Sequence, residues 1–324
     1  MEVKDVAAGL RDQILGRTGN NILFNGPKRI DNANFRTIEK ITGKEISCFV
    51  DGGNLDIIRS NSINLQLVRA CGAVFEGNVR KDIIKEEFFV LTRTEIEGED
   101  MRYIAKCYGT FNEEFIFDAY EPTLREGNFR VEISKIGETV RRYFEVIFMS
   151  KIIERIPGMA YLVRDGKLRA EIVGEEKHCS TLLSRADEKG IILAGVAKTN
   201  SIITDHGIPA SSALIKRAPP GRWQYLLESG RISSHMAKLN ENSRHVLYVE
   251  STDDAFSMLA ENSSDAAFPG YPYGLVMADR MARVSFNEGE YYKTRLMAEM
   301  GKDWERIKDM MTTRDAHDIL DNMG

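Results

Sequence analysis

The sequence predicts an α/β fold built on a mixed sheet, in which an antiparallel meander and parallel strands are flanked by helices. Two observations lead to this prediction. Between residues 46 and 111, four runs of β-branched and aromatic residues are separated by glycine or charged clusters, which is typical of consecutive antiparallel strands. After residue 133, helical and strand-like segments alternate, which is typical of parallel strands reached through helices.

The first 45 residues are expected to form a helical extension. VKDVAAGLRDQIL at 3–15 has the pattern of a helix, and a connector rich in Asn and Gly follows it. A second short helix is expected near NFRTIEKI at 34–41. The core of the fold therefore begins at residue 46.

The meander is expected to consist of four strands with short connections. Its runs are ISCFVDGG at 46–53, INLQLVRACGAVFEG at 63–77, KEEFFVLTRTEIEG at 85–98 and MRYIAKCYGTF at 101–111. A long amphipathic helix follows the meander and stops at Pro157-Gly158. Its apolar residues at helical spacing are Val140, Phe144, Ile147, Phe148, Ile152 and Ile156.

The remaining elements alternate up to a helical C-terminal end. They are expected as a strand MAYLVRDG at 159–166, a helix near TLLSRADEKG at 181–190, strands IILAGVAK at 191–198 and HVLYVE at 245–250, and helices from about 275. This order is the ribonuclease H-like arrangement, in which the first strand lies centrally beside parallel strands. We expect this core to span 46–285 and a helical tail to span 286–324.

Composition narrows the class of protein. The 324 residues are 43% hydrophobic, which is enough to bury a sizeable core. The net charge of -5 argues against nonspecific coating of nucleic acid or an anionic membrane, although short basic runs at 167–169, 215–222 and 280–283 could line a local channel. No apolar stretch approaches the ~20 residues of a membrane span, and charges interrupt the N-terminal segment, so a cytoplasmic protein is expected. The four cysteines form no CxxC pair and are expected to be core thiols.

Three carboxylates are candidates for a metal site. Asp51 and Asp165 each end an apolar run and precede glycine, and Glu145 lies on or beside the apolar face of the long helix. Carboxylates from strand, helix and strand suit Mg²⁺ or Mn²⁺, and two such ions about 3.5 to 4 Å apart can activate water against a phosphodiester. Alternatives remain: both aspartates are possible turn residues, and Glu145 has Arg141 and Arg142 one turn away as partners.

Four pieces of the chain, in order, resemble the NurA nuclease family. They are FVDGG, YLVRDGKL, GVAKTNS and FPGYPYGLVMADRMARVS, and the resemblance covers about residues 46 to 285. It implies a ribonuclease H-like DNA nuclease of the 5′–3′ exonuclease and single-strand endonuclease type, dependent on Mn²⁺ or Mg²⁺. It also implies a role in DNA end resection, in homologous-recombination repair, as a homodimer that docks on a hexameric HerA-type ATPase in archaeal and some bacterial systems.

The resemblance also assigns residues. Asp51, Glu145 and Asp165 match the family's carboxylates, and Tyr271 matches the tyrosine of its C-terminal motif, where it would position substrate or water. Asp279 stands where the family typically has a histidine, and it remains a possible ligand for a hard cation.

Residues that would contact DNA are less distinctive. Lys198 matches a family lysine and could hold a phosphate, and Arg217, Arg222 and Trp223 could line or stack at a channel mouth. Each has an alternative role: the basic residues could face solvent, and Trp223 and nearby Tyr225 could belong to the core edge or an interface.

Two other functions stay open from the sequence. One is a noncatalytic DNA-repair subunit that keeps the fold without the chemistry, which the aspartate at position 279 favours. The other is an actin-like or sugar-kinase-type ATPase, which shares the core and an Asp-Gly near its first strand. Such ATPases need two related phosphate loops, and the sequence shows no second glycine-rich hairpin of that kind.

Overall fold

The computed structural model describes residues 3–14, 17, 19–40, 43–266, 268–309 and 311. They form two compact units that are discontinuous in sequence. The larger unit contains Lys44–Arg164, Arg169–Ile191 and the chain from Gly274 onward. The smaller unit contains the chain up to Gly43, Asp165–Leu168 and Ile192–Tyr273. Each unit is described by itself.

The sheet of the larger unit confirms the predicted meander. Five strands pair in antiparallel order: β4 (Ile46–Arg59), β5 (Ile63–Glu76), β6 (Val79–Glu97), β7 (Asp100–Gly109) and β8 (Glu114–Asp118). On its other edge β4 pairs in parallel with β9 (Met159–Asp165), whose final residue is counted with the smaller unit. The first strand of the meander therefore lies between β5 and β9, as the sequence predicts.

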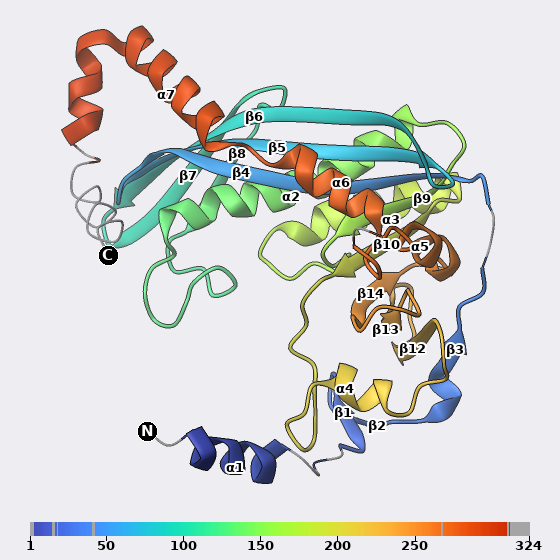
Figure 1. Cartoon of the computed structure of the whole chain (residues 1–324). Coiled ribbons are helices and arrows are strands. Elements are labelled where there is room, and N and C mark those ends of the chain that lie inside the picture. Colours follow the sequence, from blue (N-terminus) through green and yellow to red (C-terminus); the bar gives the residue numbers. More distant parts are fainter. Residues whose placement is uncertain are drawn as a thin grey trace. The chain divides into compact units, whose positions relative to one another are not determined.

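One face of this sheet is covered by the predicted long helix, α2 (Ile133–Arg155) (Figure 1). Its Phe144, Phe148 and Ile152 are fully buried because they lie on the face turned to the strands, whereas Ile147 of the same predicted set is only partly buried. The helix ends just before Pro157-Gly158, and Gly158 adopts a positive φ of 71°. A second helix, α3 (Glu175–Lys189), packs against α2.

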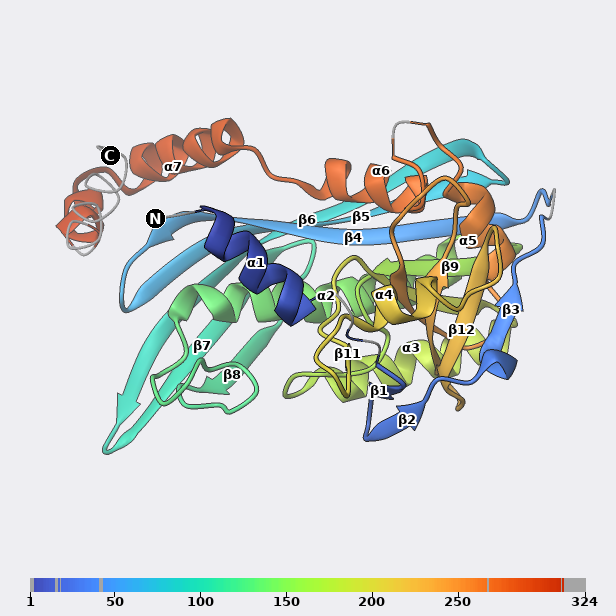
Figure 2. The ribbon, with the colours of Figure 1, turned by 60° about the horizontal axis from the view of Figure 1, so that its bottom comes forward.

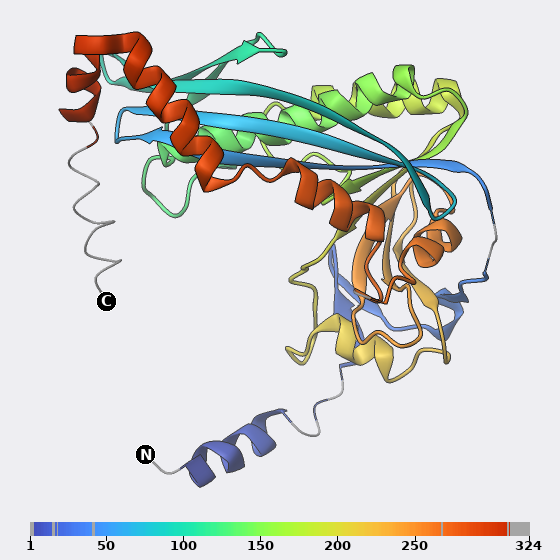
Figure 3. The ribbon, with the colours of Figure 1, turned by 45° about the horizontal axis from the view of Figure 1, so that its top comes forward.

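The opposite face of the larger unit is crossed by α6 (Tyr273–Ala282) and α7 (Phe286–Met300), which a short 3₁₀ turn, η2 (Gly301–Asp303), follows (Figure 3). A cluster beneath the end of this segment includes Ile57, Leu67 and Trp304. The helical character predicted for the tail from 286 is confirmed as far as the described residues extend. The part of the predicted tail from 312 to 324 lies outside them.

The smaller unit contains short antiparallel strands and helices (Figure 2). Its main sheet has the antiparallel order β3 (Phe35–Thr37), β12 (Trp223–Glu228), β13 (Ser233–Lys238), β14 (Leu247–Ser251) and β10 (Ile192–Ala197). A small second sheet joins β11 (Ile203–Thr204), β1 (Asn21–Leu23) and β2 (Pro27–Arg29). Its helices are α1 (Val3–Ile14), η1 (Asn32–Asn34), α4 (Ala210–Ile215) and α5 (Phe256–Asn262).

The predicted helix at 34–41 is wrong. Phe35–Thr37 form strand β3, which pairs with Trp223–Tyr225 of β12. The ring of Phe35 packs edge-on against Trp223 and Tyr225, at centroid distances of 5.4 and 4.8 Å. Aromatic packing with a strand nearly 190 residues away overrides the local helical pattern. Among the described residues up to 43, only α1 is α-helical, so the segment is not a helical extension throughout.

All four cysteines are buried and free, as expected for core thiols. Burial raises the pKa of the Cys71 thiol to about 11 and that of Cys107 to about 12. Within the described ranges, none of the helices has the length and apolar character needed to cross a bilayer.

Candidate functional site

Asp51 does not end its strand, contrary to the sequence prediction. Strand β4 continues through Asp51, Gly52 and Gly53 to Arg59, and these three residues pair with Cys71, Ala70 and Arg69 of β5. The two glycines serve close packing: a Cβ at Gly52 would lie 2.5 Å from Oε1 of Glu145, and one at Gly53 would lie 2.5 Å from the carbonyl oxygen of Ala282. What ends at this point is the pairing with β9, whose last registered pair is Val50 and Arg164.

Glu145 is the centre of a buried ion-pair network on the α2 face of the sheet. It is 3% exposed, and its Oε1 pairs with Arg141 while its Oε2 accepts hydrogen bonds from Nε and Nη2 of Arg164 at 3.2 and 3.0 Å. Arg141 also donates to the carbonyl oxygen of Gly52 at 2.9 Å. The alternative considered from the sequence, an ion pair with Arg141, is therefore present.

A second buried glutamate extends this network. Glu175 accepts from Nε of Arg142 at 2.7 Å and lies 3.4 Å from Nη1 of Arg164. Burial by itself raises the pKa of Glu175, but the hydrogen bond from Arg142, that from the backbone of Glu171 and the charge of Arg164 together hold this pKa below its ordinary value. Both buried glutamates thus lie against arginines inside the larger unit.

Asp51 and Asp279 lie on facing elements on the other face of β4. A Cβ at Gly274 would overlap the ring of Phe49, and Ala282 lies against Gly53, so α6 runs along β4 in the same direction. Because side chains alternate along a strand, Asp51 shares the face of Phe49 and Gly53. Asp51 lies about 7 Å beyond Phe49 on the strand. Asp279 lies about 7 Å beyond Gly274 on the helix. The fold therefore brings Asp51 and Asp279 to the same level.

These two aspartates differ in environment. Asp51 is 8% exposed, and its Oδ1 accepts the amide of Gly52 at 2.7 Å. Asp279 is half-buried and pairs with Nη2 of Arg283 at 2.7 Å, one turn along the chain. The guanidinium of Arg283 is largely exposed, so it can leave Asp279 at little cost.

Asp165 belongs to a group in the smaller unit. It ends β9 as predicted, and Gly166 turns the chain with a φ of +118°. A Cβ at Gly195 would lie 2.6 Å from the carbonyl oxygen of Gly166, so the turn lies tightly against β10. Lys198, just beyond β10, then places its Nζ 2.6 Å from Oδ2 of Asp165 and 5.1 Å from the ring centre of Tyr271.

The predicted site residues thus fall into two groups, one in each unit. Asp51, Glu145 and Asp279 lie in the larger unit, and Asp165, Lys198 and Tyr271 lie in the smaller one. Across the described part of the chain, no three His, Cys, Asp or Glu side chains form a ready metal-binding group. The donors nevertheless fit a hard divalent cation in kind, because carboxylate oxygens are its preferred ligands and Glu145, Asp165 and Asp279 each already carry a cationic partner.

The residues predicted to contact DNA have different positions. Trp223 is 2% exposed in the core of the smaller unit, so the prediction that it stacks on bases is wrong, and the alternative of a core residue holds. Arg217 donates to the carbonyl oxygen of Gly19 and to Oδ1 of Asn20, which ties α4 to the N-terminal segment. Arg222 lies 3.4 Å from Oγ of Ser264. The DNA contacts proposed for both arginines stay predictions.

Apart from Arg141, the sequence did not reveal the partner of the buried Glu145, which is Arg164. Arg164 stands in the apolar run YLVRD, and a charged residue inside a buried strand must have an opposite charge nearby. That signal predicts a partner for Arg164 but does not identify it, because Glu145 and Glu175 come from two separate helices.

Comparison with known proteins addresses the fold. Neither the protein-family models nor the curated proteins include a match to this chain. Among solved structures, the NurA nuclease from Sulfolobus solfataricus aligns with a TM-score of 0.51 at 10% identity, covering 93% of this chain and 94% of that one. The chain has the fold of the NurA nucleases. A structure of NurA with manganese aligns with a TM-score of 0.50 at 9% identity, covering 92% and 97% of the two chains.

The NurA fold confirms the predicted ribonuclease H-like class. The antiparallel meander, the parallel pairing of β9 with β4 and the flanking helices are the elements that the sequence indicates. At about one identical residue in ten, the likeness concerns the fold, and the chemistry has to be argued from the side chains of this chain.

Proposed function

We propose that this protein is a nuclease that hydrolyses DNA with Mn²⁺ or Mg²⁺. The observation that carries the proposal is that Asp51 and Asp279 lie at one level on the neighbouring elements β4 and α6, in a chain that has the NurA fold over nearly its whole length. Both side chains offer carboxylate oxygens, which are the ligands that Mg²⁺ and Mn²⁺ prefer.

Asp165 is proposed as a further ligand. Its support is the resemblance of the motif YLVRDGKL to the NurA family. Glu145 is proposed as a fourth ligand. Its carboxylate is held by Arg141 and Arg164, so it would have to exchange an arginine for the ion.

When bound, one or two ions would supply Lewis-acid activation of a water molecule and of the phosphodiester. The chain's own residues prepare the site. The carboxylates offer hard ligands, Lys198 supplies a positive charge for a phosphate oxygen, and the buried ring of Tyr271 beside Lys198 positions the substrate. The Gly52 amide fixes the orientation of the Asp51 carboxylate.

A 5′–3′ exonuclease and single-strand endonuclease activity in end resection belongs to the same proposal. So do a homodimer and a hexameric HerA-type ATPase as partner. The support for these is the resemblance of the motifs FVDGG, YLVRDGKL and GVAKTNS to the NurA family.

The test is cleavage of end-labelled single- and double-stranded DNA in EDTA, Mg²⁺ or Mn²⁺. Asp51→Asn and Asp165→Asn should each reduce cleavage by more than about a hundredfold, since even groups that only support metal ligands cost ~10–100-fold. Asp82→Asn is the matched control. Like Asp51 it lies in the meander and accepts the amide of its neighbour at 2.7 Å, but it is exposed.

Cleavage that needs metal, persists in Asp82→Asn and is lost in both other variants supports the proposal. Cleavage at the wild-type rate by folded Asp51→Asn would overturn the ligand assignment. Absence of cleavage in any metal, with and without the ATPase, would favour the noncatalytic subunit. That alternative has one structural observation in its favour, the arginine pairing of Glu145.

A further inference from the structure

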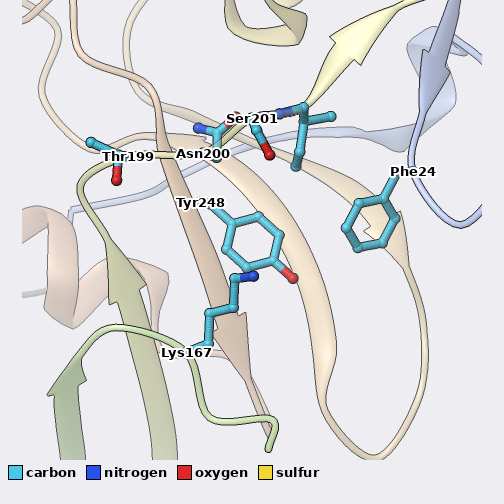
Figure 4. Close-up of a pocket in the computed structure, with 7 residues that line it drawn as sticks. Phe24, Lys167, Thr199, Asn200, Ser201 and Tyr248 are labelled. Atoms are coloured by element: carbon cyan, nitrogen blue, oxygen red, sulfur yellow. Dashed lines mark hydrogen bonds between the residues drawn. The ribbon is translucent and has the colours of Figure 1, made fainter. Parts of the chain in front are cut away.

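A pocket of about 420 Å³ lies wholly within the smaller unit (Figure 4). Its walls come from four segments: the turn after β1, the segment after β9, the loop after β10, and β14. Figure 4 labels Phe24, Lys167, Thr199, Asn200, Ser201 and Tyr248. The volume falls in the range of sites for small organic ligands. None of the residues that line it is acidic.

Two aromatic rings form one side of this pocket. Tyr248 is 3% exposed, and its hydroxyl donates to Oε1 of Glu250 at 2.8 Å and lies 3.0 Å from Oγ of Ser234. The ring is therefore fixed before any ligand arrives. Phe24, which is half-buried, lies with its ring centre 6.1 Å from that of Tyr248. Because Tyr248 is almost fully buried, Phe24 supplies the accessible aromatic face, and such faces stack on bases with little dependence on sequence.

The charge of the pocket favours an anion. The ammonium of Lys167 lies 5.7 Å from the ring centre of Tyr248, and that of Lys28 lies 5.2 Å from the ring centre of Phe24. Lys28 is paired with Glu228 at 3.4 Å, and Glu250 is engaged by Tyr248 and by the amide of Leu168 at 2.7 Å, so the positive charge that lines the pocket is that of Lys167. A ligand with a flat aromatic part and a negative part matches these two features.

The third wall supplies neutral hydrogen-bonding groups. Thr199, Asn200 and Ser201 are exposed and offer hydroxyl and amide groups to the pocket, and Oδ1 of Asn200 caps the loop by accepting the amide of Ile202 at 3.3 Å. Hydroxyl and amide side chains are common donors to phosphate and sugar oxygens.

The pocket is linked in sequence to the proposed catalytic residues. Lys167 is two residues beyond Asp165, and Thr199 directly follows Lys198, which pairs with Asp165 at 2.6 Å. A ligand held here is thus held by the same two segments that carry Asp165 and Lys198. This favours a part of the substrate strand over an unrelated small molecule.

We propose that this pocket binds one unpaired nucleotide of single-stranded DNA, with its base on Phe24 and its phosphate beside Lys167. The proposal rests on the proposed nuclease function and adds a binding position for one unstacked base of the strand. It assigns a binding role to Phe24, which the motif comparison does not single out.

The test is binding of a fluorescein-labelled dT12 strand, measured by fluorescence anisotropy in EDTA, so that no strand is cut. Phe24→Ala and Lys167→Met should each weaken binding about tenfold, in keeping with the usual loss of one stacked base or one phosphate contact. Lys106→Met is the matched control. Its ammonium also lies over a tyrosine ring, Tyr108 at 5.4 Å, but in the larger unit.

A second variant guards against misfolding. Ser201→Glu places a negative charge in the pocket at an exposed position, which the fold tolerates, and it should also weaken binding about tenfold. A dT12 strand with abasic sites should bind the wild type less tightly than dT12, and this preference should vanish in Phe24→Ala. Wild-type affinity in Ser201→Glu and Lys167→Met would overturn the proposal.

Free dTMP distinguishes a mononucleotide site from a strand site. Displacement of dT12 only at concentrations far above that of an unlabelled dT12 competitor supports the strand. Displacement by dTMP at equal concentration would overturn it in favour of a free nucleotide. Binding is measured in EDTA and cleavage in Mn²⁺, so the two proposals are tested separately. Loss of binding in the pocket variants supports the pocket even if the protein cuts no DNA. Unchanged binding refutes the pocket even if the protein cuts DNA.

Discussion

The two Asp-Gly pairs of this chain look alike in sequence and differ in structure. Asp51-Gly52 lies inside a 14-residue strand, where the glycine leaves room for the carboxylate of Glu145. Asp165-Gly166 ends a strand, where the glycine adopts a φ of +118° and nothing lies within 4 Å of its added Cβ. Glycine therefore answers two different needs, close approach in the first case and backbone conformation in the second.

The surroundings of the two Asp-Gly pairs differ in how they accommodate ionisable side chains. Beside Gly52, in the larger unit, Glu145 and Arg164 are both buried and remain paired. In the smaller unit, Asp165 and Lys198 meet at a more exposed place, and the half-buried His235 has its pKa lowered to about 4, chiefly by burial. The larger unit stabilises buried charge by pairing, whereas the smaller unit favours the neutral form of a half-buried imidazole.

The difference between the two units is tested most directly by removing the buried carboxylate of Glu145. Glu145→Ala should lower the free energy of unfolding by about 3 to 5 kcal/mol, because Arg164 is left buried without its main partner. Urea denaturation measures this. Glu86→Ala is the control, since its partners Lys151 and Arg155 are much more exposed, and it should cost less than about 1 kcal/mol. Equal losses in both variants would contradict the role assigned to pairing.

The neutral histidine of the smaller unit gives a pH dependence. Between about pH 6.5 and the folded pKa of about 4, the unfolded chain binds a proton on His235 that the folded chain does not. The stability should therefore fall as the pH falls through this window, by up to about 3 kcal/mol. In His235→Gln this loss should be reduced.

Phe256→Leu is the control for this pH dependence. Its ring packs against His235 at a centroid distance of 4.8 Å, so the variant removes a contact without removing the titrating group. It should lower stability while keeping the pH slope. An unchanged slope in His235→Gln would mean that other groups govern acid sensitivity.

Substitutions of Gly52 and Gly166 are expected to have smaller effects on stability. Gly52→Ala should cost about 1 to 3 kcal/mol, because the new methyl group overlaps the side chain of Glu145. Gly166→Ala should cost about 1 kcal/mol from its positive φ alone. In the double variant Gly52→Ala/Glu145→Ala, the cost of the alanine should largely disappear. A cost that persisted there would show that Gly52 is needed for its backbone conformation instead.

The smallest effect is expected at the exposed ion pair of Asp279. Arg283→Ala should change the free energy of unfolding by less than about 0.5 kcal/mol, because the guanidinium is 75% exposed. Thermal denaturation at low and high salt measures this. A loss above 1 kcal/mol would contradict the small contribution expected of this exposed ion pair.

The sequence by itself determined the meander, the long helix and the strand that ends at Asp165. These elements follow from local periodicity: two residues per repeat in the strands, 3.6 in the helix that carries Phe144, Phe148 and Ile152, and a glycine after Asp165. It also supplied the carboxylates of the proposed site, since each stands at the border of an apolar run.

Only the tertiary structure decided what lies across from these residues. It placed Glu145 against Gly52, gave it Arg164 as a partner, brought Asp279 to the level of Asp51, and buried Trp223 against Phe35. It also made a strand of Phe35–Thr37, where the local pattern favours a helix. The reason is that these contacts join residues up to about two hundred positions apart. No periodicity within one segment records which distant side chain will neutralise a charge or fill the space that a glycine leaves open.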